Sequence, residues 1–358
     1  MTLLIMVALV IFGGQIDYSW PFMWGLGLTA WFLVADRRCL KTPWFWVWPV
    51  FYALLLTQSV VTGVFLDGVA YVPDTWIPFS IFGSVSLGNI GGWLLVGAVA
   101  TKTALDGEGW FETVCKGDYD GSLKWTVRRD YRPYVVVLAT GLAVLGCVQY
   151  HLGATRFGWV IPYNKEFFSM FPYVNNAGIF FVLAAGIALT LTRRWWPLII
   201  LFIYSSYLTH TRFAWPCFAA LLIWRTNNKY LRGALVPLAI LCVRWFWPDM
   251  IGNRLPEYHK MWCVLAQFPW FGAGSWGFAA FVPGGVYGVF DVLMWATEYG
   301  IVGLSLIIVG FAGVFRRFRL EDTMDLAVVC VLGHSLIDMP LHHVGILCLV
   351  LVTAGRKR

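Results

Sequence analysis

Long apolar runs recur along the whole chain, and they constrain its fold more than any other feature. Their centres lie near residues 8, 27, 54, 90, 141, 184, 203, 219, 239, 303, 330 and 348. A helix needs about 20 apolar residues to cross a bilayer, and the runs near 8, 203, 219 and 330 are shorter than that. The pattern predicts an all-α polytopic membrane protein of about 12 transmembrane helices, with residues 1–358 forming a single transmembrane domain.

Composition supports this interpretation. The chain is 59% hydrophobic and 13% charged, whereas a soluble domain carries about 25% charged residues. The eight cysteines are scattered singly without a C-x-x-C pair, so we expect small buried side chains rather than a disulfide framework. The first apolar run, residues 2–12, lacks a basic leader and a small-residue cleavage site, and we expect a retained first span.

The basic residues predict the topology. If the N-terminus is cytoplasmic, all but six of the 26 basic residues fall in cytoplasmic loops or termini, at every second turn of the chain. This is the pattern of the positive-inside rule, so the net charge of +7 indicates membrane topology and not nucleic-acid binding. Both termini are then cytoplasmic. The six exceptions, at the periplasmic side, are Arg156, Lys165, Arg212, Arg244, Arg254 and Lys260.

Two loops stand out in this topology. Residues 102–132 form the main cytoplasmic loop, which mixes charges of both signs and is typical of a solvated connector. Residues 249–290 form a long periplasmic loop, rich in Gly, Pro and aromatic residues, that we expect to be partly helical. Long loops of this kind often carry function. All six histidines also fall near periplasmic helix ends, so we expect the functional site on that side.

The first polar motif lies between two short apolar runs and reads Thr209-His210-Thr211-Arg212. Arg212 is either an interfacial anchor, whose charged head reaches the lipid headgroups, or part of an anion site. The second alternative follows from the guanidinium group, which binds phosphate oxygens in a bidentate manner and keeps its charge.

The second motif, within the long periplasmic loop, contains Arg254, Glu257, His259 and Lys260, followed by Pro269 and Gly272-x-Gly274. Its cationic and titratable groups would raise the local potential for a diphosphate. We expect the glycines to let the backbone approach a substrate closely. The alternative is an ordinary amphipathic helix that ends at glycine.

The third motif places ionisable residues in an otherwise apolar hairpin near the C-terminus. His334 and Asp338 are spaced i, i+4, so they share a helical face. Ionisable groups at membrane depth mark a functional site by default. A metal site formed with His342 and a hydrogen-bonded structural His–Asp pair are both alternatives, but Pro340 interrupts the continuous face that a metal site would use.

In this order, the segments resemble the superfamily of O-antigen ligases and O-antigen polymerases, which are bacterial inner-membrane glycosyltransferases. The resemblance covers about residues 170–345. It rests on Phe171-Pro-Tyr-Val-Asn175-Asn176-Ala177, on Thr211-Arg212, on Arg254-Leu-x-x-Tyr258 with Pro269 and Gly272-x-Gly274, on Leu293 through Glu298-Tyr-Gly300-Ile-Val-Gly303, and on His334-Ser-Leu-Ile-Asp338-Met-Pro340-Leu341.

The resemblance implies a GT-C-like fold and a glycan donor on undecaprenyl diphosphate, transferred to an acceptor hydroxyl without a cofactor or metal. It implies a role in lipopolysaccharide biosynthesis, with membrane lipid and a chain-length regulator protein as further partners. The implied site has diphosphate-binding, catalytic and supporting residues. They are Arg212, Arg254, Lys260 and Arg156 for the diphosphate, His259, Glu257 and His334 as general-base candidates, and Asp338, His210, Glu298, Asn175 and Asn176 in support.

One difference from the family pattern separates two activities. The ligases carry a His-Asn pair eleven residues before the glycine that matches Gly300, where this chain has Val289 and Phe290. This favours a polymerase of lipid-linked repeat units over a ligase. A lipid-linked glycan flippase, a metal-dependent membrane hydrolase and a purely structural membrane subunit are the competing classes. A flippase needs polar groups through the bilayer midplane, and the cytoplasmic halves of the expected helices are poor in them.

Overall fold

The computed structural model places most of the chain in helices. The residues that the structure describes are 2–11, 20–34, 37–68, 79–106, 111–117, 124–130, 132–153, 168–171, 173–226, 228–230, 232–234, 237, 240–241, 244, 254–274, 278, 290–338 and 340–356.

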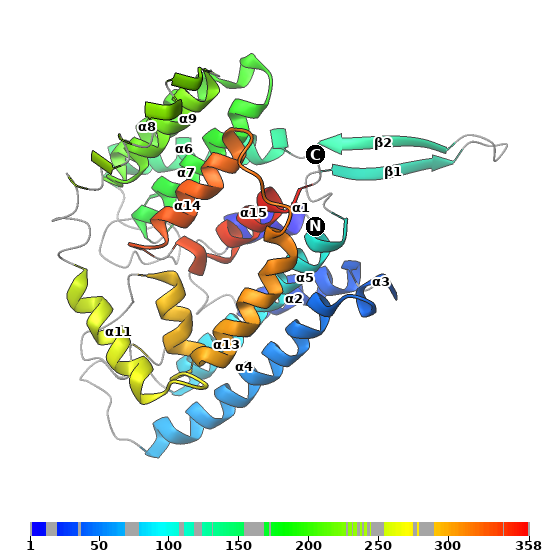
Figure 1. Cartoon of the computed structure of the whole chain (residues 1–358), viewed down its shortest axis with the longest axis vertical. Helices are drawn as coiled ribbons and strands as arrows, with labels where there is room; N and C mark the ends of the chain where they lie inside the picture. Colours follow the sequence, from blue (N-terminus) through cyan, green and yellow to red (C-terminus); the bar gives the residue numbers. More distant parts are fainter. Residues whose placement is uncertain are drawn as a thin grey trace.

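The helices coincide with the apolar runs of the sequence, apart from the run near 239, most of which lies outside the described residues. Figure 1 shows their arrangement. In chain order they are α1 (Thr2–Ile11), α2 (Trp20–Val34), α3 (Arg37–Leu40), α4 (Pro43–Gly68), α5 (Phe79–Asp106), α6 (Arg132–His151), α7 (Val174–Thr190), η1 (Arg193–Trp195), α8 (Pro197–Leu208), α9 (Ala214–Arg225), α11 (Leu255–Gln267), α13 (Asp291–Phe315), α14 (Thr323–His334), η3 (Pro340–His342) and α15 (Val344–Ala354).

The expected connector at residues 102–132 contains a two-stranded hairpin, which the sequence did not predict in this otherwise helical chain. After α5 ends at Asp106, β1 (Phe111–Gly117) and β2 (Lys124–Asp130) form an antiparallel hairpin, in which Phe111 pairs with Asp130. The first half of β2, Lys124-Trp-Thr-Val127, alternates polar and apolar residues, and this period of two favours a strand over a helix. The long loop at residues 249–290 contains α11, as expected of a partly helical loop.

Helix length separates the elements that can cross a membrane from those that cannot. Within the described residues, α6 and α13 are long and apolar enough by length and composition. Helices α8, α9 and α14 have 12 residues each, or roughly 18 Å at 1.5 Å per residue. A bilayer core of about 30 Å is longer than any of these three helices. Large apolar side chains such as Phe32 and Ile200 are nevertheless exposed, which gives the surface a transmembrane character.

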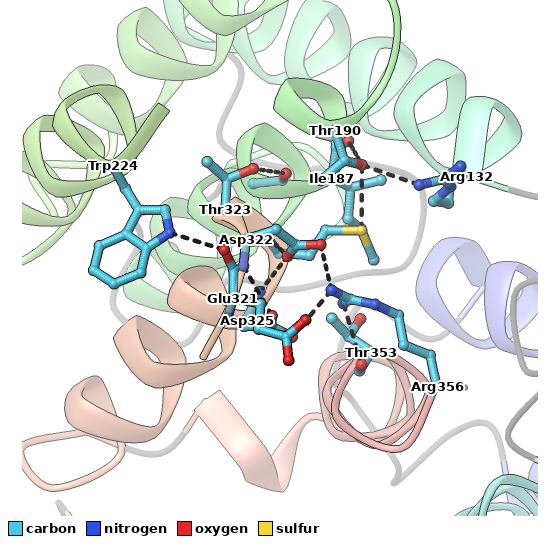
Figure 2. A network of polar contacts seen from close by, with 12 residues as sticks. Arg132, Ile187, Thr190, Trp224, Glu321, Asp322, Thr323, Asp325, Thr353 and Arg356 are labelled. Carbon is cyan, nitrogen blue, oxygen red and sulfur yellow. Dashed lines mark hydrogen bonds and ion pairs between the residues drawn. The ribbon is translucent and has the colours of Figure 1, made fainter. Parts of the chain in front are cut away.

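Polar contacts gather at one end of the helices, which we name the basic end. Arg132 at the start of α6 donates to Thr190 at the end of α7 (3.3 Å). Arg317 after α13 donates to the carbonyl of Thr103 in α5 (3.0 Å). Figure 2 shows the largest part of this network. The basic end is formed by Thr103, Arg132, Thr190, Trp224, Arg317, Glu321, Asp322, Asp325 and Arg356.

An arginine holds α14 and α15 together at the basic end. Asp322 caps α14 with a reciprocal capping box that includes Asp325. Arg356, which follows α15, forms ion pairs with Asp322 (2.5 Å) and Asp325 (3.1 Å), as Figure 2 shows. Trp224 of α9 donates to the carbonyl of Glu321 beside them (3.4 Å). Helices α7, α9, α13 and α15 therefore end where α6 and α14 begin, as alternating spans require.

Helix α13 is broken at Gly300, whose backbone has φ 68° and ψ −176°. Figure 1 shows its two pieces meeting at a sharp angle. The segment Pro269–Gly274, which follows α11, supplies hydrogen bonds to the backbone around the break. These bonds run from Ala273 to Thr297 (2.8 Å), from Gly274 to Glu298 (2.9 Å), from Ile301 to Pro269 (2.8 Å) and from Val302 to Trp270 (3.1 Å). Irregular backbone inside a membrane protein needs partners of this kind.

Two glycines make this close approach possible, and the expected approach of a substrate to the glycine motif stays a prediction. A Cβ atom at Gly272, where φ is 73°, would overlap the carbonyl of Glu298. A Cβ atom at Gly300 would overlap the backbone of Trp270 and Phe271. The glycine motif is therefore explained by contact between two segments of the chain.

Gly300→Ala tests this packing. An alanine would have to adopt a backbone conformation that is nearly exclusive to glycine and would also overlap Trp270, so we expect a loss of about 2 kcal/mol or more in unfolding free energy. Thermal unfolding of the detergent-purified protein measures it. The control is Gly141→Ala in α6, where a Cβ atom meets open space. Equal unfolding temperatures of the two variants would contradict the close packing of Gly300 against the Trp270 backbone.

Candidate functional site

The end of the helices opposite the basic end is named the histidine end. The carboxylate of Asp338 is the centre of a buried polar cluster there. Tyr173 donates to Asp338 Oδ2 through its hydroxyl (3.2 Å), and Asn175 donates to the same oxygen through Nδ2 (2.7 Å). His334 Nε2 lies 3.8 Å from it. The histidine end thus brings together the start of α7 and the end of α14.

Local structure explains the position of Asp338. Helix α14 ends at His334, but the amide of Asp338 still donates to the carbonyl of His334 (2.9 Å). One further turn therefore keeps the i, i+4 pair on one side, as the spacing predicted. Pro340 then begins the short η3, and the face does not continue to His342.

The turn between α8 and α9 lies against the same cluster. Thr211 donates to Asn175 Oδ1 (3.4 Å), and Thr209 and Thr211 share a hydrogen bond (2.8 Å). His210 in this turn has φ 53° and is exposed. Arg212 follows directly and is also exposed. Arg212 is therefore the next residue in the chain after Thr211, whose side chain bonds Asn175 of the Asp338 cluster.

Arg254 adds a positive charge from the start of α11. It forms a hydrogen bond with Tyr173 and interacts electrostatically with Asp338. Burial lowers the pKa of the Arg254 guanidinium, but Asp338 and Tyr173 raise it by more, so the pKa lies above its ordinary value. Tyr258, one turn further along α11, donates to the carbonyl of Leu336 (2.7 Å) and holds α11 against the turn after α14.

Tyr173 stays a hydrogen-bond donor at neutral pH. Burial, followed by the charge of Asp338, raises the pKa of its hydroxyl to about 12. The phenol therefore remains protonated and can bond the carboxylate while it accepts a hydrogen bond from Arg254. The neutral hydroxyl of Tyr173 therefore connects the partly exposed Arg254 guanidinium to the buried Asp338 carboxylate.

His334 is the least satisfied member of the cluster. Its side chain is 3% exposed, and neither ring nitrogen has a hydrogen-bond partner among the described residues. The ring packs against Phe213 of the α8–α9 turn, with centroids 5.2 Å apart. A buried imidazole without partners costs free energy and calls for an explanation. Asn176, the next supporting residue predicted from the sequence, has a buried side-chain oxygen without a partner in the described structure.

A second buried group joins the first half of α13 to η3. Asp291 accepts hydrogen bonds from the amides of Leu341 (3.0 Å) and His342 (3.1 Å), and from His342 Nδ1. His342 Nε2 lies 3.9 Å from Glu298 Oε2. The amide of Asp291 donates to the carbonyl of Ser335 (3.1 Å), which connects this group to the turn that carries Asp338.

The remaining general-base candidates lie along α11, away from Asp338. Glu257 and Lys260 form an ion pair with each other (2.6 Å). His259 is exposed and lies 3.7 Å from the thiol of Cys263. The structure therefore gathers Arg254, His334, Asp338 and Asn175, places Arg212 and His210 in the adjoining turn, and leaves His259, Glu257 and Lys260 on another part of α11.

Arg156, which the sequence suggested for the diphosphate, lies outside the described residues. In the described part of the chain, no three His, Cys, Asp or Glu side chains are grouped so that they could hold a metal ion.

Sequence reasoning gave no role to Tyr173 or Asp291. The signal for Asp291 was present, because it is a single acidic residue at the start of a long apolar run and directly follows the Val289-Phe290 position.

No family model matches the chain, and neither a curated protein nor a solved structure matches it.

Replacing Asp338 tests the cluster. Asp338→Leu leaves the donors of Tyr173 and Asn175 without their acceptor and removes the charge that Arg254 faces, so we expect a loss of about 1–3 kcal/mol in unfolding free energy. Asp338→Asn keeps one acceptor oxygen and should lose less. Thermal unfolding of both variants in detergent measures the difference. If both unfold at the temperature of the unchanged chain, Asp338 does not hold these segments together.

Proposed function

We propose that this protein is a membrane glycosyltransferase that polymerises oligosaccharide repeat units carried on undecaprenyl diphosphate. The observation that carries the proposal is the contact of Arg254 with the Asp338, Tyr173 and His334 group, at one end of the helices. An arginine that is half-buried beside titratable groups can bind a phosphate and keep its charge. Residues from four of the motifs that resemble the O-antigen superfamily lie in or beside this group.

The proposed topology follows from the two ends. The basic end faces the cytoplasm of the bacterial inner membrane with both termini, because positive residues favour that side. Arginines there lie over tryptophan rings, as Arg225 does over Trp196 (5.2 Å) and Arg232 over Trp224 (4.6 Å). The histidine end then faces the periplasm. About 12 segments cross or enter the bilayer in a GT-C-like arrangement, although the shortest helices do not span it alone.

The donor diphosphate binds to arginine side chains in this proposal. Arg254 is the main contact, and Arg212 reaches the same ligand from the α8–α9 turn. Lys260 and Arg156 contribute at the periphery, Lys260 after release from Glu257. Charge-assisted contacts of this type are each worth about 1.5–3 kcal/mol. Cationic side chains that stabilise the departing diphosphate make a metal or another cofactor unnecessary.

The chemical step is a direct displacement. The hydroxyl oxygen of the acceptor glycan forms a bond to the anomeric carbon of the donor, and the bond from that carbon to the diphosphate oxygen breaks. The diphosphate leaves with the electron pair, and the hydroxyl proton passes to a base. We assign this base to His334, because it belongs to the Arg254 group whereas His259 and Glu257 do not. Catalytic distances in ligand-free enzymes are often long, which fits the 3.8 Å between His334 and Asp338.

A polymerase is preferred to a ligase for a specific reason. Phe290 lies at the start of α13 against Tyr258, where the ligases carry an Asn. The next residue, Asp291, forms a hydrogen bond with His342, which comes from η3. A chain-length regulator protein would then act as the partner, in lipopolysaccharide biosynthesis.

Arg254→Ala is the principal test. We expect it to abolish extension of a lipid-linked oligosaccharide by the purified protein, because the leaving diphosphate loses its main cation, while Arg254→Lys retains a fraction of the activity. Gel analysis of the products measures both. Arg225→Ala at the basic end is the matched control and should extend normally. Normal extension by Arg254→Ala would remove this residue from the mechanism.

The gel also separates the competing activities of the unchanged protein. A ladder of products means polymerisation, whereas a single larger product that requires an acceptor means ligation. Unchanged donor in the presence of acceptor supports a flippase and contradicts the proposed transfer.

The choice of base is tested by a pair of glutamine variants. We expect His334→Gln to lower the extension rate by about 100-fold or more, and His259→Gln to leave it within a factor of about two, because His259 lies outside the Asp338 cluster. Initial rates at saturating donor measure both, and thermal unfolding checks that His334→Gln folds. The reverse order of the two rates would assign the base to His259.

A further inference from the structure

Helix α11 has two apolar faces. Its inner face carries Met261, Val264 and Leu265, which are buried against the first half of α13 and its neighbours. Its outer face is exposed at positions 255, 259, 262, 263 and 266, which follow the spacing of a single helical stripe. A helix with only one apolar face would leave its outer face polar.

Two of the five stripe positions carry large, exposed apolar side chains. Leu255 is 54% exposed and Trp262 is 62% exposed. The same surface continues into the turn after α11, where Trp270 is 64% and Phe271 is 58% exposed. Gln58 of α4 donates to the carbonyl of Phe271, so this turn is fixed to the second half of a long helix. Aromatic side chains with a polar atom are enriched where a membrane meets water.

Lys260 and Glu257, which form an ion pair one turn apart, lie outside this stripe, and His259 is a polar side chain within it. Figure 1 shows α11 lying crosswise to α4, on the side of the molecule opposite the β1–β2 hairpin. A helix that lies crosswise to the long helix α4, with exposed apolar side chains on its outer face and a charged pair beside them, has the geometry of an in-plane interfacial helix.

We infer that α11 lies in the plane of the membrane surface at the histidine end, with Leu255, Trp262, Trp270 and Phe271 inserted among the lipid chains. The occupant of this surface is bilayer lipid. Buried contacts to α13 fix one face, and lipid covers the other. Because α11 begins at Arg254, the helix also sets the depth of that guanidinium at the level of the lipid phosphates. A phosphate-bearing lipid can then reach Arg254 by lateral movement within the leaflet. The lipid contact itself does not depend on glycosyl transfer.

Spin labels on α11 test the orientation in the full chain, reconstituted in phosphatidylethanolamine–phosphatidylglycerol vesicles and free of native cysteines. The labels are attached at Trp262→Cys on the stripe and at Lys260→Cys outside it. We expect the label at 262 to collide with a water-soluble nickel chelate about threefold less often than the label at 260, and more often with oxygen. Equal access of the chelate to both sites would overturn the inference.

A second measurement does not depend on replacing a tryptophan. Cys263 is a native exposed thiol on the same stripe. In vesicles, we expect a water-soluble maleimide to modify Cys263 in the unchanged chain about tenfold more slowly than it modifies the thiol of Lys260→Cys, because lipid covers the stripe. Peptide mass spectrometry identifies the modified residue. Equal rates at the two positions would contradict insertion of α11 even if the spin-labelled variants failed to fold.

Discussion

The Asp338 carboxylate is the interaction on which the histidine end depends. A buried carboxylate is costly unless it is paired and hydrogen-bonded, and Asp338 obtains these partners from segments far apart in the sequence. Tyr173 and Asn175 come from the start of α7, and Arg254 comes from the start of α11. The cost of burying one charge is thus offset by contacts that align three segments. The same contacts place a partly exposed arginine beside an imidazole.

The broken helix α13 shows a second constraint of the same kind. A break at Gly300 frees backbone groups that lipid cannot satisfy, and the Pro269–Gly274 segment satisfies them. Asp291 and Glu298 lie on the first half of α13 and contact His342. The loop that follows α11 therefore packs into the helical domain. This connects the position of Arg254 to the geometry of α13, since both depend on how α11 and the following turn are packed.

The sequence was sufficient for part of this structure. Hydropathy located the helices because an apolar run can be read from the sequence without knowing which segments pack against it. The i, i+4 spacing of His334 and Asp338 predicted a contact within one turn. The hairpin at Phe111–Asp130 was missed because charges of both signs were taken as a sign of a connector. The contact of Gly272 with Glu298 was not foreseen, because it depends on a segment more than twenty residues away in the sequence.

The candidate site was predictable in the same uneven way. Asp338 was recognised as a charge in an apolar hairpin, and Arg254 as one of a cluster of charged groups in the long loop, but Tyr173, which links them, has no charge to reveal it. His259 was a general-base candidate that shares the long loop with Arg254, and α11 turns it toward a different face from the one that Tyr258 presents to Leu336. Proximity in sequence along a helix does not fix a shared face.

The most direct measurement is the affinity of the purified protein for undecaprenyl diphosphate, compared between the unchanged chain and Arg254→Ala in the same detergent. The loss of a charge-assisted contact worth about 1.5–3 kcal/mol corresponds to a rise in Kd of about 10-fold to 150-fold. We expect a rise in that range, with unchanged binding by Arg225→Ala. Equal affinity of Arg254→Ala and the unchanged chain would contradict a diphosphate site at the histidine end.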